Sequence, residues 1–524
     1  MRFLAPLIGF ILLLTPSLWF TWNNQDDPRF GDFGDDGLYF TSAKSLLDGG
    51  GYRISSLPGE PAQTKYPPGY PALLASVWAD GATFPQNLEQ AVWVQWRMLP
   101  VMLLLAMLYW RKLGLDVQWQ WGLAALLALN PYVIFFSVML MSEIPFTVFV
   151  LAVLIALHTA ETQNWEWVAI AGITAGIAFL FRTAGVALLV SVPAVFLFRR
   201  KFKEAAIFFL TMLPAVIGWA IWSKQHIGPG TDLITLYYTN YAGFHWLNFH
   251  WNEAHLFLWK NIDSALYGIG ALVLPKVSEA LPVKILTQLL ALAALRGSWK
   301  LCKSKSDWQY GAFGAVFLAM LVIWSFPPNE RFVLPLAPLL LAGFCFEMKE
   351  LVGNIRKGFS HKDGSQRIAA RIMAAAVCTL FAACFMSQIF TVFNLLPSMM
   401  DGFRQRLERN KPAFAWVKNN LPADARILAE QDTLIYLYTG RKSANLIIPT
   451  VHMYRDEAKE IVAAYSGAIE YARRHGLNYL YLTKEDFRRD LDEEDYKKIQ
   501  TSLANPVGVE KVYDKDGIRI FKLD

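Results

Sequence analysis

The residues of this sequence that are best suited to chemistry are charged side chains close to long apolar runs. Two acidic residues, Asp35 and Asp36, follow a glycine-containing turn, and a third, Glu143, lies in a short turn between two apolar blocks. The cations of interest are Lys65, Arg182 and Arg331. A carboxylate can take the proton from an acceptor hydroxyl, and fixed cations can stabilise a phosphate that leaves. Transfer of a sugar from a lipid phosphate needs both kinds of group.

Four of these residues also have a purely structural interpretation. Asp35 could cap the helix expected after it, because an Asp at that position accepts hydrogen bonds from free backbone amides. Glu143 could be a simple interface residue at the membrane edge. Arg182 and Arg331 could extend to the membrane surface, although charges so near the bilayer usually face a protein interior or a wet cavity. The sequence leaves both interpretations open.

The loop that contains Asp35 and Lys65 is too patterned for a simple connector. An amphipathic helix is expected to end at Gly49-Gly50-Gly51, and such a helix can lie along a membrane surface. The later run Pro67-Pro68-Gly69 is by itself typical of a turn that opens a helix. The aromatic residues of this loop that we expect to contact substrate are Tyr39, Tyr66 and Tyr70.

Composition places the chain in a membrane. Of its 524 residues 54% are hydrophobic and only 18% are charged, whereas soluble domains usually carry about a quarter charged residues. The net charge of +6 would suggest nucleic acid in a soluble protein, but the basic residues cluster between apolar blocks, where membrane topology explains them. We therefore expect no nucleic-acid partner. The four cysteines imply no disulfide framework.

Counting one membrane span per apolar block predicts about eleven transmembrane helices. The blocks lie near 3–22, 92–110, 117–140, 145–159, 166–181, 184–198, 205–222, 281–296, 309–326, 332–346 and 373–394. The first block is long for a signal peptide and has no small-residue cleavage site. We interpret it as an uncleaved span.

The basic loops predict the orientation. Alternate loops, among them 111–112 and 199–203, are rich in Lys and Arg, which places them in the cytoplasm. The first external loop, 23–90, then shares one face with the other candidate residues and with everything after residue 395. The stretch 265–280 could be re-entrant, interfacial or the start of a tilted helix. An extra span there would invert the placement of the C-terminal segment.

The segment after residue 395 has the pattern of a small α/β domain. The expected elements are helices over 405–420 and 455–474 and strands over 426–429, 445–448, 478–483, 507–513 and 518–522. No Gly-rich phosphate loop, metal-ligand spacing or nucleophile motif occurs in it. The chain thus divides into a transmembrane domain, 1–394, and a soluble extracytoplasmic domain, 395–524, that serves acceptor recognition or structure.

One more external loop, 226–260, combines four histidines with many tyrosines and tryptophans. The five-residue spacing of His245, His250 and His255 does not bring pairs to one face of a helix, so we predict no metal site. The aromatic residues suit contact with sugar or lipid. They equally suit an interfacial aromatic belt.

These motifs, in this order, resemble those of a known superfamily. Asp35-Asp36-Gly37-Leu38-Tyr39 followed by Lys65-Tyr66-Pro67-Pro68-Gly69-Tyr70-Pro71 resembles the first external loop of the GT-C glycosyltransferases. The branch is that of bacterial protein-mannosyltransferases and aminoarabinose transferases. The turns at Glu143, Arg182 and Arg331 are similar to later landmarks, so the resemblance covers roughly residues 1–345. The motifs are specific as an ordered set and weak singly.

The resemblance implies a polytopic α-helical fold and an inverting transfer from a polyprenyl-phosphate sugar, without metal or other cofactor. Asp35 matches the catalytic carboxylate, Asp36 stands where many members have Glu, and Glu143 matches a second acidic landmark. The expected contacts of the donor phosphate and carrier are Lys65, Arg182 and Arg331, although Tyr66 separates Lys65 from Pro67, unlike the family pattern, and leaves its phosphate role open. The acceptor would be a lipid-linked glycan, lipid A or a protein, reached from the periplasmic face of a bacterial inner membrane.

Two other function classes compete with this one. A ligase for polyprenyl-linked polymers would share the carrier but not this first loop. A transporter or flippase would be expected to have internal repeats and charged or broken helices at mid-membrane. The sequence shows no convincing repeat, and its charges lie at the outer edge.

Overall fold

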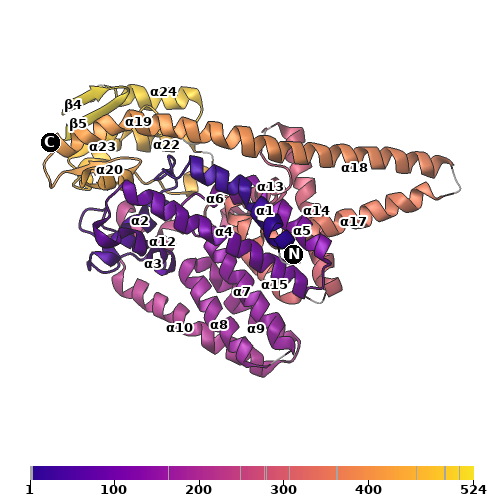
Figure 1. Cartoon of the computed structure of the whole chain (residues 1–524). Helices are drawn as coiled ribbons and strands as arrows, with labels where there is room; N and C mark the ends of the chain where they lie inside the picture. Colours follow the sequence, from indigo (N-terminus) through magenta and orange to yellow (C-terminus); the bar gives the residue numbers. More distant parts are fainter. Residues whose placement is uncertain are drawn as a thin grey trace.

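The computed structural model describes residues 4–162, 164–247, 249–276, 278, 280–305, 307–361, 364–455, 457–488, 491–504, 506 and 508–523. A bundle of helices fills most of the volume, and a small α/β domain lies at one end (Figure 1). Residues 1–3, at the start of the first predicted block, lie outside the described part. The fold is that of an α-helical polytopic membrane protein with a small C-terminal α/β domain, as predicted.

Six helices among the described residues are long and apolar enough to cross a membrane. They are α1 (Leu4–Asn23), α4 (Gln86–Lys112), α7 (Glu143–Thr162), α10 (Phe202–His226), α17 (Ala337–Phe359, preceded by the short turn from Glu330) and α18 (Gly364–Phe390). The shorter apolar helices are α8 (Glu166–Phe181), α9 (Val186–Phe198) and α15 (Trp308–Val322). Every predicted block contains a helix, and the count of eleven spans stays a prediction.

The block predicted over 117–140 is interrupted. It contains α5 (Val117–Ala128) and α6 (Pro131–Phe136), and Asn130 between them accepts hydrogen bonds from the backbone amides of Tyr132 and Val133. Proline at the first helical position and a side-chain cap before it are the usual start of a new helix. The chain therefore turns before it reaches Glu143.

Small residues let the bundle helices pack closely. A Cβ atom on Gly297 in α14 (Leu281–Lys305) would lie 1.9 Å from the carbonyl oxygen of Gly343 in α17. No side chain fits at that distance, so the contact needs glycine. Such close approach is the usual means of helix association in membranes.

The stretch 265–280 continues α13 (Ala254–Ala271) and remains close to the turn that contains Arg331. Asp263 forms an ion pair with Lys284 at the start of α14, at 2.7 Å. Lys276 forms another with Glu330, also at 2.7 Å. The first pair ties α13 to α14, and the second holds the segment beside the turn that contains Arg331. Residues 277 and 279 lie outside the described part.

A continuous helical rod joins the bundle to the C-terminal domain (Figure 1). It comprises α18, a π-helical turn (Thr391–Leu395) and α19 (Leu396–Asn420), 57 residues in all. At 1.5 Å per residue it is about 85 Å long. The helix predicted over 405–420 is thus the end of a much longer one, and no linker interrupts the chain at residue 395.

The C-terminal domain contains a five-stranded sheet in the order β2-β1-β3-β5-β4. The strands are β1 (Arg426–Leu428), β2 (Lys442–Ala444), β3 (Tyr479–Leu482), β4 (Val509–Lys515) and β5 (Ile518–Leu523). β2, β1 and β3 are parallel, and β5 pairs antiparallel with β3 and β4. The predicted strands at 426–429 and 478–483 and the hairpin are confirmed, with Val507 outside the described residues.

Two predictions in this domain are wrong. The strand expected over 445–448 lies instead at β2, because residues 445–448 leave the sheet and bury their apolar side chains under other helices. The helix expected over 455–474 is divided into α22 (Ala458–Ser466) and α23 (Ala468–Arg474), since Gly467 interrupts it. Residue 456 lies outside the described part.

The domain rests directly on the first loop. Gly37, in α2 (Asp35–Leu47), lies so close to α20 (Asp432–Thr439) that a Cβ would be 2.0 Å from the Thr433 hydroxyl. The Asp32 carboxylate accepts from the Arg406 guanidinium of α19. The C-terminal domain therefore helps to position the residues on either side of Asp35.

Candidate functional site

A cavity of about 300 Å³ lies beside the first turn of α2. Its polar lining includes Asp35, Tyr39, Lys65, Tyr66, Arg182 and Arg331. Six of the nine residues predicted for the site therefore meet in one place, although they come from four separate segments. The other three, Asp36, Glu143 and Tyr70, lie behind this lining.

Asp35 faces the cavity with a fixed carboxylate. Its Oδ1 accepts a hydrogen bond from the Tyr66 hydroxyl, and its Oδ2 accepts from Nη2 of Arg331 at 2.5 Å. Burial alone would raise the pKa of Asp35, but the charges of Arg331 and Lys65 outweigh it and hold the pKa below its usual value. Asp35 is thus an anion near neutral pH, and its partners are side chains rather than the amides that a helix cap would bind.

Asp36 points into the loop instead of the cavity. It is 1% exposed and accepts from the backbone amides of Gly31, at 2.9 Å, and Gly37, at 2.8 Å. Burial raises its pKa to about 7. These two hydrogen bonds fix the turn that precedes α2 and so the direction of Asp35.

Glu143 lies behind the cavity and holds two arginines. Its Oε1 accepts from Nε of Arg331 at 2.5 Å and from Nη1 of Arg182 at 2.8 Å. Its side chain is fully buried, and Oε2 has no hydrogen-bond partner within the described residues. Because Arg331 also binds Asp35, one guanidinium connects both carboxylates. Glu143 is therefore placed to orient cations, whereas Asp35 is placed to meet a ligand.

Lys65 occupies an aromatic cage. Its Nζ lies 3.5 Å from the ring centroid of Tyr237, 4.3 Å from that of Tyr241 and 5.3 Å from that of Tyr66. The lysine is 5% exposed, and its Nζ makes no hydrogen bond to any described residue. Burial lowers its pKa to about 7, against the opposing effect of Asp35. A cation held by ring faces keeps its hydrogen-bonding capacity for a ligand.

The two remaining predicted tyrosines differ in role. Tyr39 lines the cavity, with its hydroxyl 3.4 Å from that of Ser142, and its ring packs 4.7 Å from that of Tyr66. Tyr70 is fully buried and donates to Gln95 at 2.9 Å. Tyr70 supports the ring of Tyr39 from behind and does not face the cavity.

The opposite wall is apolar. It is formed by the helices α9 and α15 and the turns beside them, through Val186, Phe317, Met320, Leu321 and Trp324. A ligand that fills the cavity therefore meets charges on one side and hydrocarbon on the other. This is the environment expected for the junction between a phosphate and a lipid chain.

Sequence reasoning missed the specific role of Tyr237 and Tyr241. Their loop carried only a general aromatic signal, and its histidines take other positions: His245 is buried against Ser325, while His250 and His255 are exposed. Throughout the described ranges, no three His, Cys, Asp or Glu side chains are grouped so that they could hold a metal ion.

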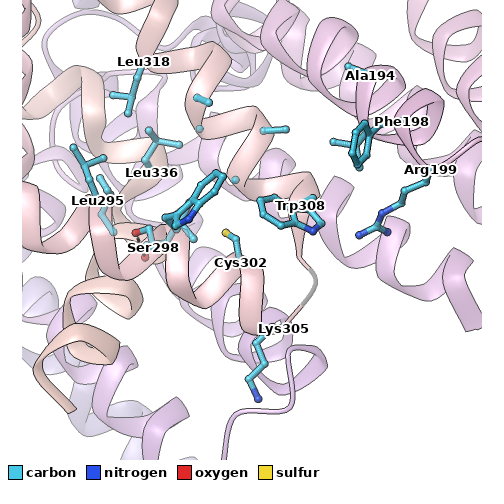
Figure 2. A pocket seen from close by; sticks show the side chains of 18 of the residues that line it. Ala194, Phe198, Arg199, Leu295, Ser298, Cys302, Lys305, Trp308, Leu318 and Leu336 are labelled. Carbon is cyan, nitrogen blue, oxygen red and sulfur yellow. Dashed lines mark hydrogen bonds between the residues drawn. The ribbon is translucent and has the colours of Figure 1, made fainter. Parts of the chain in front are cut away.

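A larger cavity, of about 1100 Å³, lies elsewhere, between α9, α14 and α15 (Figure 2). Its walls are mainly apolar, and its charged lining residues are Glu161, Arg199 and Lys305. Arg199 is paired with Glu161 at 2.8 Å. This cavity lacks the array of carboxylates and cations around Asp35, so we place the candidate site at the smaller one.

Comparison with known proteins supports the architecture. No family model and no curated protein matches the sequence. Among solved structures, the Archaeoglobus fulgidus oligosaccharyltransferase in the apo form matches with a TM-score of 0.52 and 13% identity, over 91% of this chain and 69% of that one. Its complex with Zn and sulfate gives a TM-score of 0.50 and 14% identity, over 86% of this chain and 64% of that one. ArnT from Cupriavidus metallidurans bound to undecaprenyl phosphate gives a TM-score of 0.49 and 13% identity, over 93% of each chain.

Proposed function

This chain has the GT-C fold, and we propose that it is a membrane glycosyltransferase that moves a sugar from a polyprenyl phosphate to an extracytoplasmic acceptor. One observation carries the proposal: an ionised Asp35 and the cations Lys65, Arg182 and Arg331 line one cavity whose other wall is apolar. A transporter has no evident need for such an array at one membrane edge.

The roles of the residues follow from their positions. Asp35 takes the proton of the acceptor hydroxyl as the acceptor oxygen bonds to the anomeric carbon of the sugar. The bond from that carbon to the phosphate oxygen breaks, and the electron pair leaves with the phosphate. Attack from the face opposite the leaving group inverts the anomeric configuration. Because Asp35 is held by Arg331 and Tyr66, little reorganisation is needed when the acceptor arrives.

The cations serve the phosphate. Lys65 is buried with no hydrogen-bonded partner among the described residues, so an incoming phosphate would supply the anion that favours its charged form. Arg182 lies across the same cavity and can donate to phosphate oxygens. Both would stabilise the charge that develops as the sugar leaves. The apolar wall would receive the first isoprene units of the carrier.

The basic loops support a bacterial inner membrane location with this cavity and the C-terminal domain on the periplasmic face. The acceptor can be a lipid-linked glycan, lipid A or a protein. We propose an inverting reaction without a cofactor, because the side chains in the cavity supply both the base and the phosphate ligands.

The decisive test is Asp35→Asn in the purified full-length protein, with transfer measured from polyprenyl-phosphate sugars to membrane-extract acceptors. Loss of a general base is worth about 10²- to 10⁴-fold, so we expect transfer to fall by that factor with donor binding retained. The matched control is Asp48→Asn, the same substitution at the exposed far end of α2. Undiminished transfer by Asp35→Asn would contradict the assignment.

A further inference from the structure

A second polar pocket lies at the junction of the C-terminal domain and the first loop. Its volume is about 270 Å³. Glu430 follows β1, Asn445 follows β2, and Thr483 follows β3, so one wall is built from the carboxyl ends of all three parallel strands. The order β2-β1-β3 means that the strands that follow β1 lie on opposite sides of it. Ligands of open α/β sheets bind at this edge, where the strand order reverses.

The opposite wall belongs to the loop that precedes the catalytic carboxylate. Residues 31–34 line the pocket, and Asp35 is the next residue. Two aromatic residues that line the pocket also contact cations of the Asp35 cavity. Phe33 lies 5.4 Å from the Arg331 guanidinium, and Tyr237 lies 3.5 Å from the Lys65 ammonium. The two hollows are therefore neighbours, joined through residues that contact both.

Three residues that line this pocket have polar atoms without a hydrogen-bond partner among the described residues. Asn410, on α19, is 1% exposed, yet its Oδ1 accepts no hydrogen bond from any described residue. Oε2 of Glu485 is also buried and accepts no hydrogen bond from any described residue. The side-chain amide of Asn445 lines the pocket, and no described residue bonds to it. An unsatisfied buried acceptor is costly, as for the Asn410 and Glu485 oxygens. The Asn445 amide is only half-buried, so it is open to a polar ligand in the pocket.

Several of the charged groups around the pocket are already paired, which favours a neutral polar ligand. Asp32 is paired with Arg406, and Glu485 with Arg409. Asp486 accepts from the Thr483 hydroxyl at 2.6 Å, and burial beside Glu430 raises its pKa well above its usual range. Carboxyl, amide and guanidinium groups arranged around two aromatic rings are the partners that neighbouring sugar hydroxyls need. The volume lies just below the usual range for drug-sized ligands and suits one sugar ring.

We propose that this pocket binds a sugar residue of the acceptor, so that the acceptor is a glycan or glycolipid whose reacting hydroxyl reaches Asp35 past Phe33 and Tyr237. The inference rests on the proposed transferase function and adds the chemical class of the acceptor. The C-terminal domain then contributes directly to acceptor specificity, through side chains that follow its parallel strands.

The test uses the full-length protein in detergent and a panel of methyl glycosides of common hexoses and N-acetylhexosamines. Binding is followed by saturation-transfer NMR. Asn445→Ala removes one amide that lines the pocket and is expected to weaken glycoside binding about five- to tenfold, the effect of one or two hydrogen bonds. The matched control is Asn419→Ala, at an exposed position near the end of α19, which should leave binding unchanged.

Kinetics separates this inference from the proposed function. Asn445→Ala should raise the KM for the acceptor and leave polyprenyl-phosphate binding unaltered. Glycoside binding that depends on Asn445 in a protein without transferase activity would support the pocket and refute the function. Transfer with an acceptor KM indifferent to Asn445→Ala would refute the pocket and support the function. A panel that does not bind, or displacement of bound glycoside by Mg²⁺ or Ca²⁺, would overturn the saccharide assignment.

Discussion

Substituting Glu143 by glutamine tests whether Asp35 is the base and Glu143 only orients the two arginines. The glutamine side chain would keep the volume and one acceptor oxygen but lose the charge that holds Arg182 and Arg331. Glu143 Oε1 receives two charge-assisted hydrogen bonds, at 2.8 and 2.5 Å. Such bonds contribute about 1.5–3 kcal/mol each, against about 1 kcal/mol for neutral ones. From that difference we expect Glu143→Gln to lower the free energy of unfolding by about 2 kcal/mol.

The effect on catalysis should be indirect. Arg331 keeps its contact with Asp35, so the base remains while the geometry of the cations loosens. A displacement of that kind can cost about 10²-fold in rate. Because the substitution removes the negative charge of Glu143, Arg331 would stabilise the Asp35 carboxylate more strongly. The pKa of Asp35, which is already lowered, should therefore fall further. Transfer that is lost on acidification through the pKa of Asp35 should then persist to slightly lower pH in the variant than in wild type.

The assay is a pH–rate profile of transfer from about pH 9 down to about pH 2.5, because the lowered pKa of Asp35 places its acid limb below about pH 4. Denaturant unfolding of the same preparations accompanies it. Asp35→Asn should abolish the acid limb of any residual activity. If Glu143→Gln removed that limb, with Asp35→Asn retaining it, Glu143 would be the base and the reasoning from cavity lining would be wrong. An intact profile with normal stability would show that the arginines do not depend on Glu143.

Two other predictions follow from the same structure. Lys65→Met should weaken the binding of polyprenyl phosphate about tenfold, which corresponds to the loss of one charge-assisted contact. Because the pKa of Lys65 is about 7, the affinity of the wild type should fall as the pH rises through that value. An affinity that does not depend on pH would show that Lys65 does not contact the phosphate. Gly297→Ala should destabilise the bundle by more than about 2 kcal/mol, because its Cβ would overlap a carbonyl of α17. Gly218→Ala, where a Cβ in α10 meets nothing within 4 Å, should be neutral or stabilising; equal thermal shifts for the two variants would refute the packing argument.

The membrane fold was predictable because apolar blocks and basic loops are local signals. The rod formed by α18 and α19 was not, because its apolar half and its charged half have the patterns of different classes of segment, whereas the backbone continues through both. The misplaced strand at 445–448 has a related cause. An apolar run reports burial, but the identity of the neighbour, a sheet edge or a helix, depends on contacts far along the chain.

The site was predictable to the extent that its residues lie in ordered motifs. Asp35, Arg182 and Arg331 could be grouped because topology placed them on one face of the membrane. Which of these side chains contact one another could not be predicted. That Arg331 reaches both carboxylates, and that Glu143 is screened from the cavity, depends on contact between α7 and the turn before α17, which are 188 residues apart in the sequence. The same kind of separation hid the cage of Lys65, whose rings come from the loop after α10. The inserted Tyr66, which counted against Lys65 in the sequence, supplies both the third ring of that cage and a hydrogen bond to Asp35. A departure from the family pattern can therefore contribute to the candidate site, and the spacing of Lys65 from Pro67 is no argument against the proposed contact with phosphate.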